Sequence, residues 1–202
     1  MHLNFKGTRV EVGFSFVLVV TAMLLFFEEK IVLFSVLSSV LHELGHLFLM
    51  ILFKEKIERV VFGAFGVRIE KIAFSGISYK KEIAVALGGI LMNLALTAVS
   101  FSIYLLFHLQ SALIFAIINL LVAVMNSIPI KSLDMGKALS FLLMMKFTDE
   151  KADSIMKIIS FIFFILFSAF TAFYCVSIKL NFSLIAVAIY LLTETELKIY
   201  GQ

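Results

Sequence analysis

The sequence contains a single cysteine and a single proline among its 202 residues. One cysteine excludes an internal disulfide and a cysteine-based metal cluster, and Cys175 lies in an apolar run, where we expect a small buried hydrophobe. The sequence has no heptad pattern, internal repeat, low-complexity tract or glycine-rich phosphate loop. The functional signal must therefore come from the few polar groups within the apolar runs that dominate the chain.

Those apolar runs make the chain 62% hydrophobic, with a mean hydropathy of +1.09, whereas soluble domains are about 45–50% apolar. Such a composition is typical of a multi-pass membrane protein, and the length suits one domain over residues 1–202. Six runs reach or approach the about 20 residues that cross a bilayer core, and a short tail, about residues 193–202, follows them. The six are Val12–Phe27, Ile31–Phe53, Ile83–Phe107, Ala112–Ile128, Met156–Val176 and Phe182–Leu192.

The charges between these runs predict an orientation in the cell membrane. All but two of the 17 lysines and arginines lie on the side of the N-terminus, the exceptions being Lys30 and Lys179. The positive-inside rule then places both termini in the cytoplasm. The net charge of +3 is explained by this topology and by anionic lipid headgroups, so no nucleic-acid partner is expected.

Two segments interrupt the apolar pattern. Lys56–Lys80 alternates β-favouring residues with Gly63, Gly66 and Gly76, which predicts strands or a hairpin. Met145–Ser154 is polar and predicts a cytoplasmic loop. The expected fold class is an all-α polytopic membrane protein with about six transmembrane helices and a small β-insert between the second and third.

The second apolar run carries the motif His42-Glu43-Leu44-Gly45-His46. On a helix, His42 and His46 are at i and i+4, so both imidazoles leave the same face and can bind one metal ion. Glu43 follows the first histidine, where a carboxylate can act as general base on a water molecule activated by zinc. An ionisable group at bilayer depth is costly, which itself marks a functional site. The alternative interpretation, a histidine pair on a surface helix with a structural or vestigial role, fits poorly because the run is apolar on every side.

A catalytic zinc ion needs a third protein ligand, and Asp134 is the best candidate. It follows Pro129, which ends or kinks the fourth run and produces a non-helical break. The alternative is that Asp134 caps a helix that begins near Met135. Both roles are compatible, and the presence of the histidine motif favours the ligand role.

Taken together, the histidine motif and the downstream Asn126-x-x-Pro129-x-x-x-Leu133-Asp134 pattern resemble the site-2 protease family of intramembrane zinc metalloproteases, peptidase M50. Among its subgroups, the chain is most similar to the compact six-span bacterial form of the sporulation proteases. This resemblance implies one Zn²⁺ per chain held by His42, His46 and Asp134, and Glu43 as the base. It places Asn126 near the substrate or the oxyanion. The implied activity is cleavage of a membrane-spanning or membrane-associated protein in regulated proteolysis, with a sporulation sigma-factor precursor as the model substrate.

Two departures from the family pattern concern local geometry. Met135 stands where the family usually has a glycine after the aspartate, and Gly89 to Asn93 keeps the glycine and asparagine of a third-span motif but lacks its proline. Asn93 can hydrogen-bond to neighbouring helices or contact the substrate or the oxyanion at the catalytic site, and both interpretations stay open. His108, at the external end of the third run, is expected to be interfacial rather than a ligand.

Two other functions compete with proteolysis. A pseudoprotease would bind membrane segments without cutting them, but the intact Glu43 argues against it. A zinc transporter usually needs polar groups along a path on both sides of the membrane, and the external half of this chain has almost none. The sequence does not specify an oligomeric state.

Overall fold

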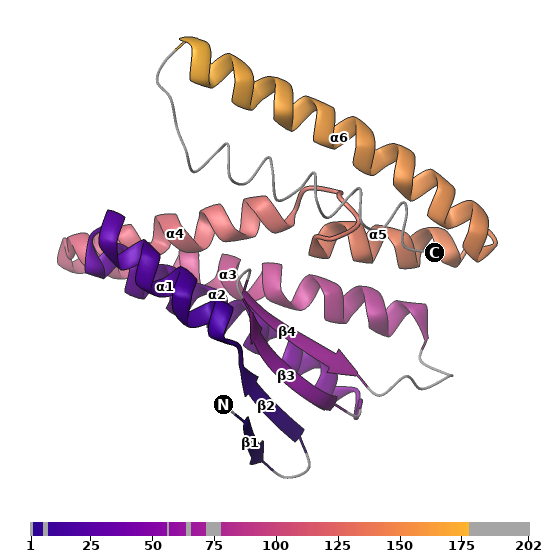
Figure 1. The fold of residues 1–202 in the computed structure, drawn as a ribbon, viewed down its shortest axis with the longest axis horizontal. Helices are drawn as coiled ribbons and strands as arrows, with labels where there is room; N and C mark the ends of the chain where they lie inside the picture. The colour runs from indigo at the N-terminus through magenta and orange to yellow at the C-terminus, as the bar shows by residue number, and fades with distance from the viewer. Residues whose placement is uncertain (1, 6–7, 56, 64–65, 72–77, 178–202) are drawn as a thin grey trace. The chain divides into compact units, whose positions relative to one another are not determined.

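The computed structural model describes residues 2–5, 8–55, 57–63, 66–71 and 78–177. The chain divides into two compact units, Met1–Met125 and Asn126–Gln202, and each is described by itself. Figure 1 traces the helices and strands along the chain. The sixth predicted run, Phe182–Leu192, and the predicted tail lie outside the described residues.

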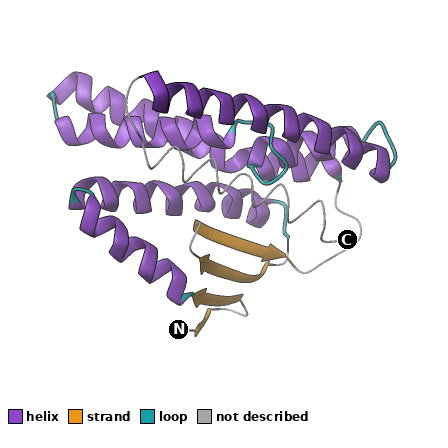
Figure 2. Ribbon diagram, turned by 45° about the horizontal axis from the view of Figure 1, so that its top comes forward, coloured by secondary structure: helices purple, strands orange, loops and turns teal. Residues whose placement is uncertain are grey.

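The first unit contains a four-stranded sheet with the order β1-β2-β3-β4. β1 pairs with β2 antiparallel, β2 with β3 parallel, and β3 with β4 antiparallel, and Figure 2 shows the strands in orange. The parallel pair is connected through two helices, α1 Phe14–Phe26 and α2 Glu29–Leu52, which form the crossover. The strands are β1 His2–Phe5, β2 Thr8–Val12, β3 Ile57–Gly63 and β4 Gly66–Lys71.

Strands β3 and β4 lie in the segment where the sequence favours strands, whereas β1 and β2 were not predicted. The first predicted run began at Val12, but in the structure Val12 ends β2 and the helix begins at Phe14. β2 pairs with β3, with Val10 opposite Val60, although α1 and α2 separate the two strands in the sequence. A local sequence pattern contains no information about a pairing partner this distant in the sequence. For this reason β2 was not predicted as a strand.

The helices of the first unit are α1 Phe14–Phe26, α2 Glu29–Leu52, α3 Tyr79–Phe107 and α4 Gln110–Asn126. α2 ends at a Schellman-type turn in which Lys54 has a φ of 60°, Lys54 N–H donates to the Ile51 carbonyl and Glu55 N–H to the Met50 carbonyl. α3 ends at Phe107, its C-cap residue is His108 with a φ of 53°, and α4 begins two residues after His108. His108 therefore serves as the cap of a tight helix–helix turn.

Among the described residues, three helices are long and apolar enough to cross a membrane: α2, α3 and α6 (Asp149–Ser177), the last through Phe173. Two apolar helices are shorter, Val17–Phe26 within α1 and Gln110–Asn126, which is α4. Length and composition thus support a membrane protein.

The second unit begins at Asn126, the last residue of α4, and contains α5 Asp134–Met144 and α6 Asp149–Ser177. α6 begins inside the segment predicted as a polar loop, Met145–Ser154, so that prediction is wrong for its second half. Asp149 and Glu150 lie in the first turn of α6, where negative charge is favourable near the positive end of the helix dipole. Ile130, Met156 and Ala152 are almost completely buried and form the core of this unit.

Candidate metal centre

Helix α2 aligns three buried polar side chains on one face. Ser38, His42 and His46 follow one another at four-residue intervals and are all buried, whereas Leu44 and Phe48 are exposed. The histidine spacing therefore produces the shared face that the sequence predicts. The rings of His42 and His46 lie nearly perpendicular, with an interplanar angle of 84°.

The two histidines point their Nε2 atoms at one another, 3.3 Å apart. Two zinc–nitrogen bonds of about 2.0–2.1 Å at a tetrahedral angle separate the nitrogens by about 3.3–3.4 Å. The pair in this structure already has the separation that a tetrahedral zinc ion requires.

A glycine of α3 leaves room beside this pair. A Cβ atom at Gly89 would lie 2.5 Å from Nε2 of both His42 and His46, which is closer than any Cβ contact tolerates. The neighbouring Gly88 has another function: its carbonyl would lie 2.5 Å from a Cβ at Gly45, so α2 and α3 cross with their backbones in contact. Gly88 thus allows close packing of the two helices, whereas Gly89 keeps the space at the imidazole nitrogens free.

The opposite ring nitrogen of each histidine faces an oxygen of α3. Nδ1 of His46 lies 2.7 Å from the Val85 carbonyl oxygen, and Nδ1 of His42 lies 2.5 Å from Asn93 Oδ1. A carbonyl oxygen only accepts, so His46 Nδ1 donates, and in the neutral ring Nε2 carries the lone pair that can bind a metal ion. Metal-binding histidines in proteins commonly make this kind of outer contact.

Glu43 follows His42 on α2 and is half-buried. On the helix it is rotated by about 100° from His42 and by about 60° from His46, so it lies beside the histidine face. A carboxylate at this position can accept a proton from a water molecule near the histidine pair.

Asp134 belongs to the second unit, where it is the first residue of α5 and 3% exposed. The residue at the N-cap position is Leu133, without a side-chain capping bond, so the capping role considered for Asp134 is not observed. Asp134 Oδ1 accepts a hydrogen bond of 3.0 Å from Nζ of Lys137, one turn further along the helix. Asp134 in the second unit and the two histidines in the first are thus each buried, and each offers a ligand atom of a kind that binds metal ions.

The turn before Asp134 depends on Gly136 and not on a glycine at 135. Met135 has no positive φ, so a residue with a Cβ adopts this conformation without strain. A Cβ at Gly136 would collide with the carbonyl oxygen of Ile130, a backbone atom that has no freedom to rotate away. The departure at Met135 is therefore tolerated, whereas the glycine that remains is required by close backbone packing.

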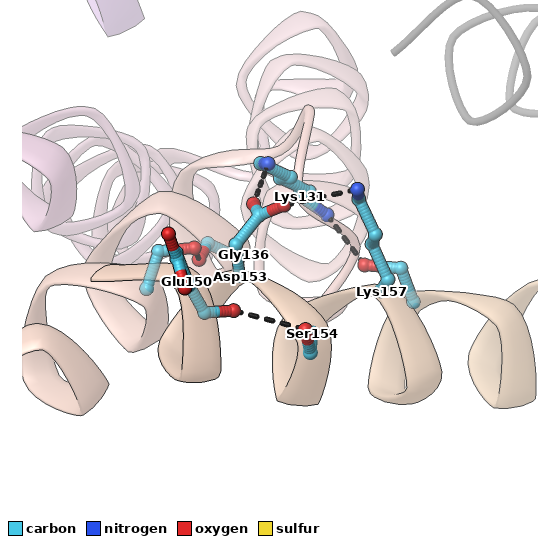
Figure 3. Close-up of polar contacts among 8 residues, drawn as sticks. Lys131, Gly136, Glu150, Asp153, Ser154 and Lys157 are labelled. Carbon is cyan, nitrogen blue, oxygen red and sulfur yellow. Dashed lines mark hydrogen bonds and ion pairs between the residues drawn. The ribbon is translucent and has the colours of Figure 1, made fainter. Parts of the chain in front are cut away.

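The same turn is attached to α6 by polar contacts. The Lys131 N–H donates to Ser160 Oγ over 3.0 Å, and Lys131 Nζ pairs with Asp153. Asp153 also pairs with Lys157 over 3.1 Å, and Figure 3 shows its carboxylate between the two lysines. Both the backbone and the side chain of Lys131 therefore bind α6 and hold the turn of residues 130–136 against that helix.

Among the remaining predicted residues, Asn126 ends α4 and is half-buried. Asn93 is fully buried and hydrogen-bonds to side chains of α2 and α4, which favours the helix-joining interpretation. Sequence reasoning missed two members of this network, Ser38 and Asn119, both fully buried. The available signal was position: Ser38 is four residues before His42, and Asn119 is an amide inside an apolar run.

This arrangement defines a class: a helical protein with long apolar helices whose second helix carries a zinc-spaced histidine pair. The chain is similar in structure to the site-2 protease from Methanocaldococcus jannaschii, with a TM-score of 0.71 and 21% sequence identity. The alignment covers 97% of this chain and 93% of the other. No protein-family model and no curated protein matches the sequence. The chain therefore has the site-2 protease fold, as the sequence resemblance implies, whereas the six-span form stays a prediction.

Proposed function

We propose that the protein is an intramembrane zinc metalloendopeptidase of the site-2 protease type. The observation that carries this proposal is the pair of buried Nε2 atoms 3.3 Å apart in an apolar helix, with Glu43 directly following the first histidine. The site-2 protease fold supports the same activity.

The proposed ligands of one Zn²⁺ per chain are His42, His46 and Asp134. Two imidazoles and one carboxylate form a donor set that zinc uses in catalytic sites, where a fourth position stays open for water or substrate. The space kept by Gly89 next to the imidazole nitrogens fits such an ion.

The proposed reaction is hydrolysis of a peptide bond. A bound zinc ion would polarise the scissile carbonyl and lower the pKa of a water molecule. Glu43 takes the proton from that water as it attacks the carbonyl carbon, and then delivers it to the leaving amine nitrogen. Asn126 is proposed to donate a hydrogen bond to the developing oxyanion. The products are a new carboxylate and a new amine.

The proposed substrate is a protein with a membrane-spanning or membrane-associated segment, cleaved in regulated proteolysis. Long apolar helices support a location in a lipid bilayer, so a substrate that shares this environment is the accessible one. The sigma-factor precursor suggested by the sequence resemblance stays a prediction.

The experiment that tests the proposal combines zinc analysis with a cleavage assay on the Glu43→Gln variant. The reconstituted wild-type protein should contain about one zinc per chain and cut members of a panel of membrane-spanning model substrates. Glu43→Gln should keep its zinc but lose at least about 100-fold in cleavage rate, because an amide does not accept the proton of water at neutral pH.

Each rival function predicts another result. A pseudoprotease would retain zinc and cut no member of the panel even as wild type. A transporter would move zinc across vesicle membranes, and Glu43→Gln would have no cleavage to lose. Unchanged cleavage in a verified Glu43→Gln preparation contradicts the proposed mechanism while leaving zinc binding intact.

We further propose that the chain is one multi-pass domain in the cell membrane with both termini in the cytoplasm, as the distribution of lysine and arginine indicates. In a Cys175→Ser background, a cysteine at Asp149 should react with an impermeant thiol reagent only from the cytoplasmic side. A cysteine at Gln110 should react only from the outside. The reverse labelling pattern would invert this orientation.

A further inference from the structure

A network of buried polar side chains is hydrogen-bonded to Nδ1 of His42. Asn93 of α3, Asn119 of α4 and Ser38 of α2 all have an exposed fraction of 0%. Asn93 Nδ2 donates to Asn119 Oδ1 over 2.8 Å and to Ser38 Oγ over 3.0 Å, and Ser38 Oγ donates to Asn119 Oδ1 over 3.0 Å. Three helices thus contribute one side chain each to a closed triangle of hydrogen bonds. All of these residues belong to the first unit.

The direction of every bond in this network follows from one backbone atom. Asn119 Nδ2 donates to the Phe115 carbonyl oxygen over 2.8 Å. A carbonyl oxygen only accepts, so the amide nitrogen of Asn119 must face Phe115 and its oxygen must face Asn93. Asn93 then has to present its amide nitrogen to Asn119. As a result, the oxygen of Asn93 faces His42.

An amide oxygen facing Nδ1 of His42 requires that Nδ1 carry the proton. The neutral ring of His42 is therefore the Nδ1–H tautomer, with the lone pair on Nε2. This is the tautomer that the Val85 carbonyl imposes on His46. The two lone pairs face one another across 3.3 Å, an arrangement that repels unless a cation lies between them.

We propose that Asn119, acting through Asn93, sets the tautomer of His42 and so prepares its Nε2 to bind a metal cation. Asn119 and Asn93 are positioning residues in this role, because neither is required as a ligand. Ser38 completes the triangle but does not determine its direction, since its hydroxyl both donates and accepts and can rotate. The metal-binding role of these hydrogen bonds rests on the proposed zinc site, whereas the tautomer of His42 follows from the hydrogen bonds alone.

Replacing Asn119 should release this constraint. In Asn119→Leu, the Ser38 hydroxyl can turn to donate to Asn93 Oδ1, and the Asn93 amide can then rotate to donate to His42 Nδ1. His42 would become a mixture of Nδ1–H and Nε2–H tautomers. Asn119→Asp should retain the native tautomer, because a carboxyl oxygen still accepts from Asn93.

The first test reads the tautomer directly. Full-length protein labelled with ¹⁵N-histidine is reconstituted in lipid bilayers, freed of metal with a chelator and studied by solid-state NMR, with His42 assigned by difference against a His42→Gln sample. The wild type, Asn119→Asp and Ser38→Ala should show a protonated Nδ1 and an unprotonated Nε2, whereas Asn119→Leu should show a mixture. Thr97→Val is the matched control: its hydroxyl bonds to the Asn93 backbone carbonyl and not to the side-chain triangle, so the tautomer should not change.

The second test measures zinc affinity by competition with a chelating dye. Loss of an outer-shell partner of a metal-binding histidine typically weakens affinity about 10- to 100-fold. Asn119→Leu should lose about tenfold, and Thr97→Val less than about twofold. If Asn119→Leu does not fold, Asn93→Leu removes the acceptor itself and should give the same mixture of tautomers.

The possible outcomes separate this inference from the proposed function. An unchanged Nδ1–H signal in Asn119→Leu, or in Asn93→Leu, overturns the inference even if the protein binds zinc and cleaves its substrate. A lost tautomer preference in a protein that binds no zinc supports the inference and refutes the proposed function. A mixed tautomer already present in the wild type overturns the inference as well.

Discussion

The two regions that carry the proposed ligands are built in different ways. His42 and His46 lie on one long helix, and the support of their Nδ1 atoms comes from neutral oxygens, the Val85 carbonyl and the Asn93 amide. Asp134 begins a short helix after an irregular turn, and its surroundings include the charged Lys137 and the backbone packing of Gly136 against Ile130. One region is held by helix periodicity and buried amides, the other by a tight turn and ion pairs.

This difference shows how position in the fold selects the supporting chemistry. Ions inside an apolar helix bundle are expensive to desolvate, so a neutral amide is the less costly way to orient a buried ring. The Lys131–Asp153 pair is partly solvated, with side chains 33% and 23% exposed, so charged groups are tolerated there. The histidine region should accordingly be insensitive to salt, and the Asp134 region should respond to it.

The largest expected effect comes from removing a ligand in either region. His42→Ala, His46→Ala and Asp134→Ala should each weaken zinc binding by more than about 100-fold, since even outer-shell changes cost 10- to 100-fold. Metal analysis of the purified variants measures this, with Thr97→Val as the control. Full zinc content in Asp134→Ala would show that the third ligand has been misassigned and that the two regions do not share one metal ion.

An intermediate effect is expected from the turn before α5. Gly136→Ala places a Cβ against the Ile130 carbonyl, which should cost about 1–3 kcal/mol of stability and reduce zinc content as the turn shifts. The matched change, Met135→Gly, should cost only the about 0.5–1 kcal/mol of a glycine in a helix and leave zinc content unchanged. Thermal unfolding in detergent compares the two. Equal losses would mean that the close packing of Gly136 does not hold the turn.

The smallest effect should follow from removing the ion pair next to the turn. Lys131→Gln is expected to lower stability by at most about 1 kcal/mol, because partly exposed pairs contribute little. The difference from wild type should shrink as salt is raised from about 10 mM to about 1 M, where the Debye length falls from about 30 Å to about 3 Å. Lys146→Gln serves as the control, because Lys146 is an exposed lysine in the turn that follows α5. A salt-independent loss in Lys131→Gln would contradict an electrostatic role for this pair.

Much of the fold could be read from the sequence, since apolar runs of sufficient length predict α2, α3 and α6 directly. The errors have two physical causes. Two helices separate β2 from its partner β3 in the sequence, so no local sequence pattern predicts this pairing. α6 starts at Asp149 because acidic residues favour a helix N-terminus. The segment was predicted as a loop because it is polar.

By itself, the sequence determined the apolar class of the protein and the shared face of His42 and His46, because a helix repeats every 3.6 residues wherever it lies. Only the tertiary structure decided which α3 and α4 side chains meet that face: Gly89 leaves space at the imidazoles, and the Asn93–Asn119 chain orients one ring. It also decided that Gly136, and not residue 135, must be a glycine. These outcomes depend on how each helix is rotated and where it crosses its neighbour, and the periodicity of one helix contains no information about either.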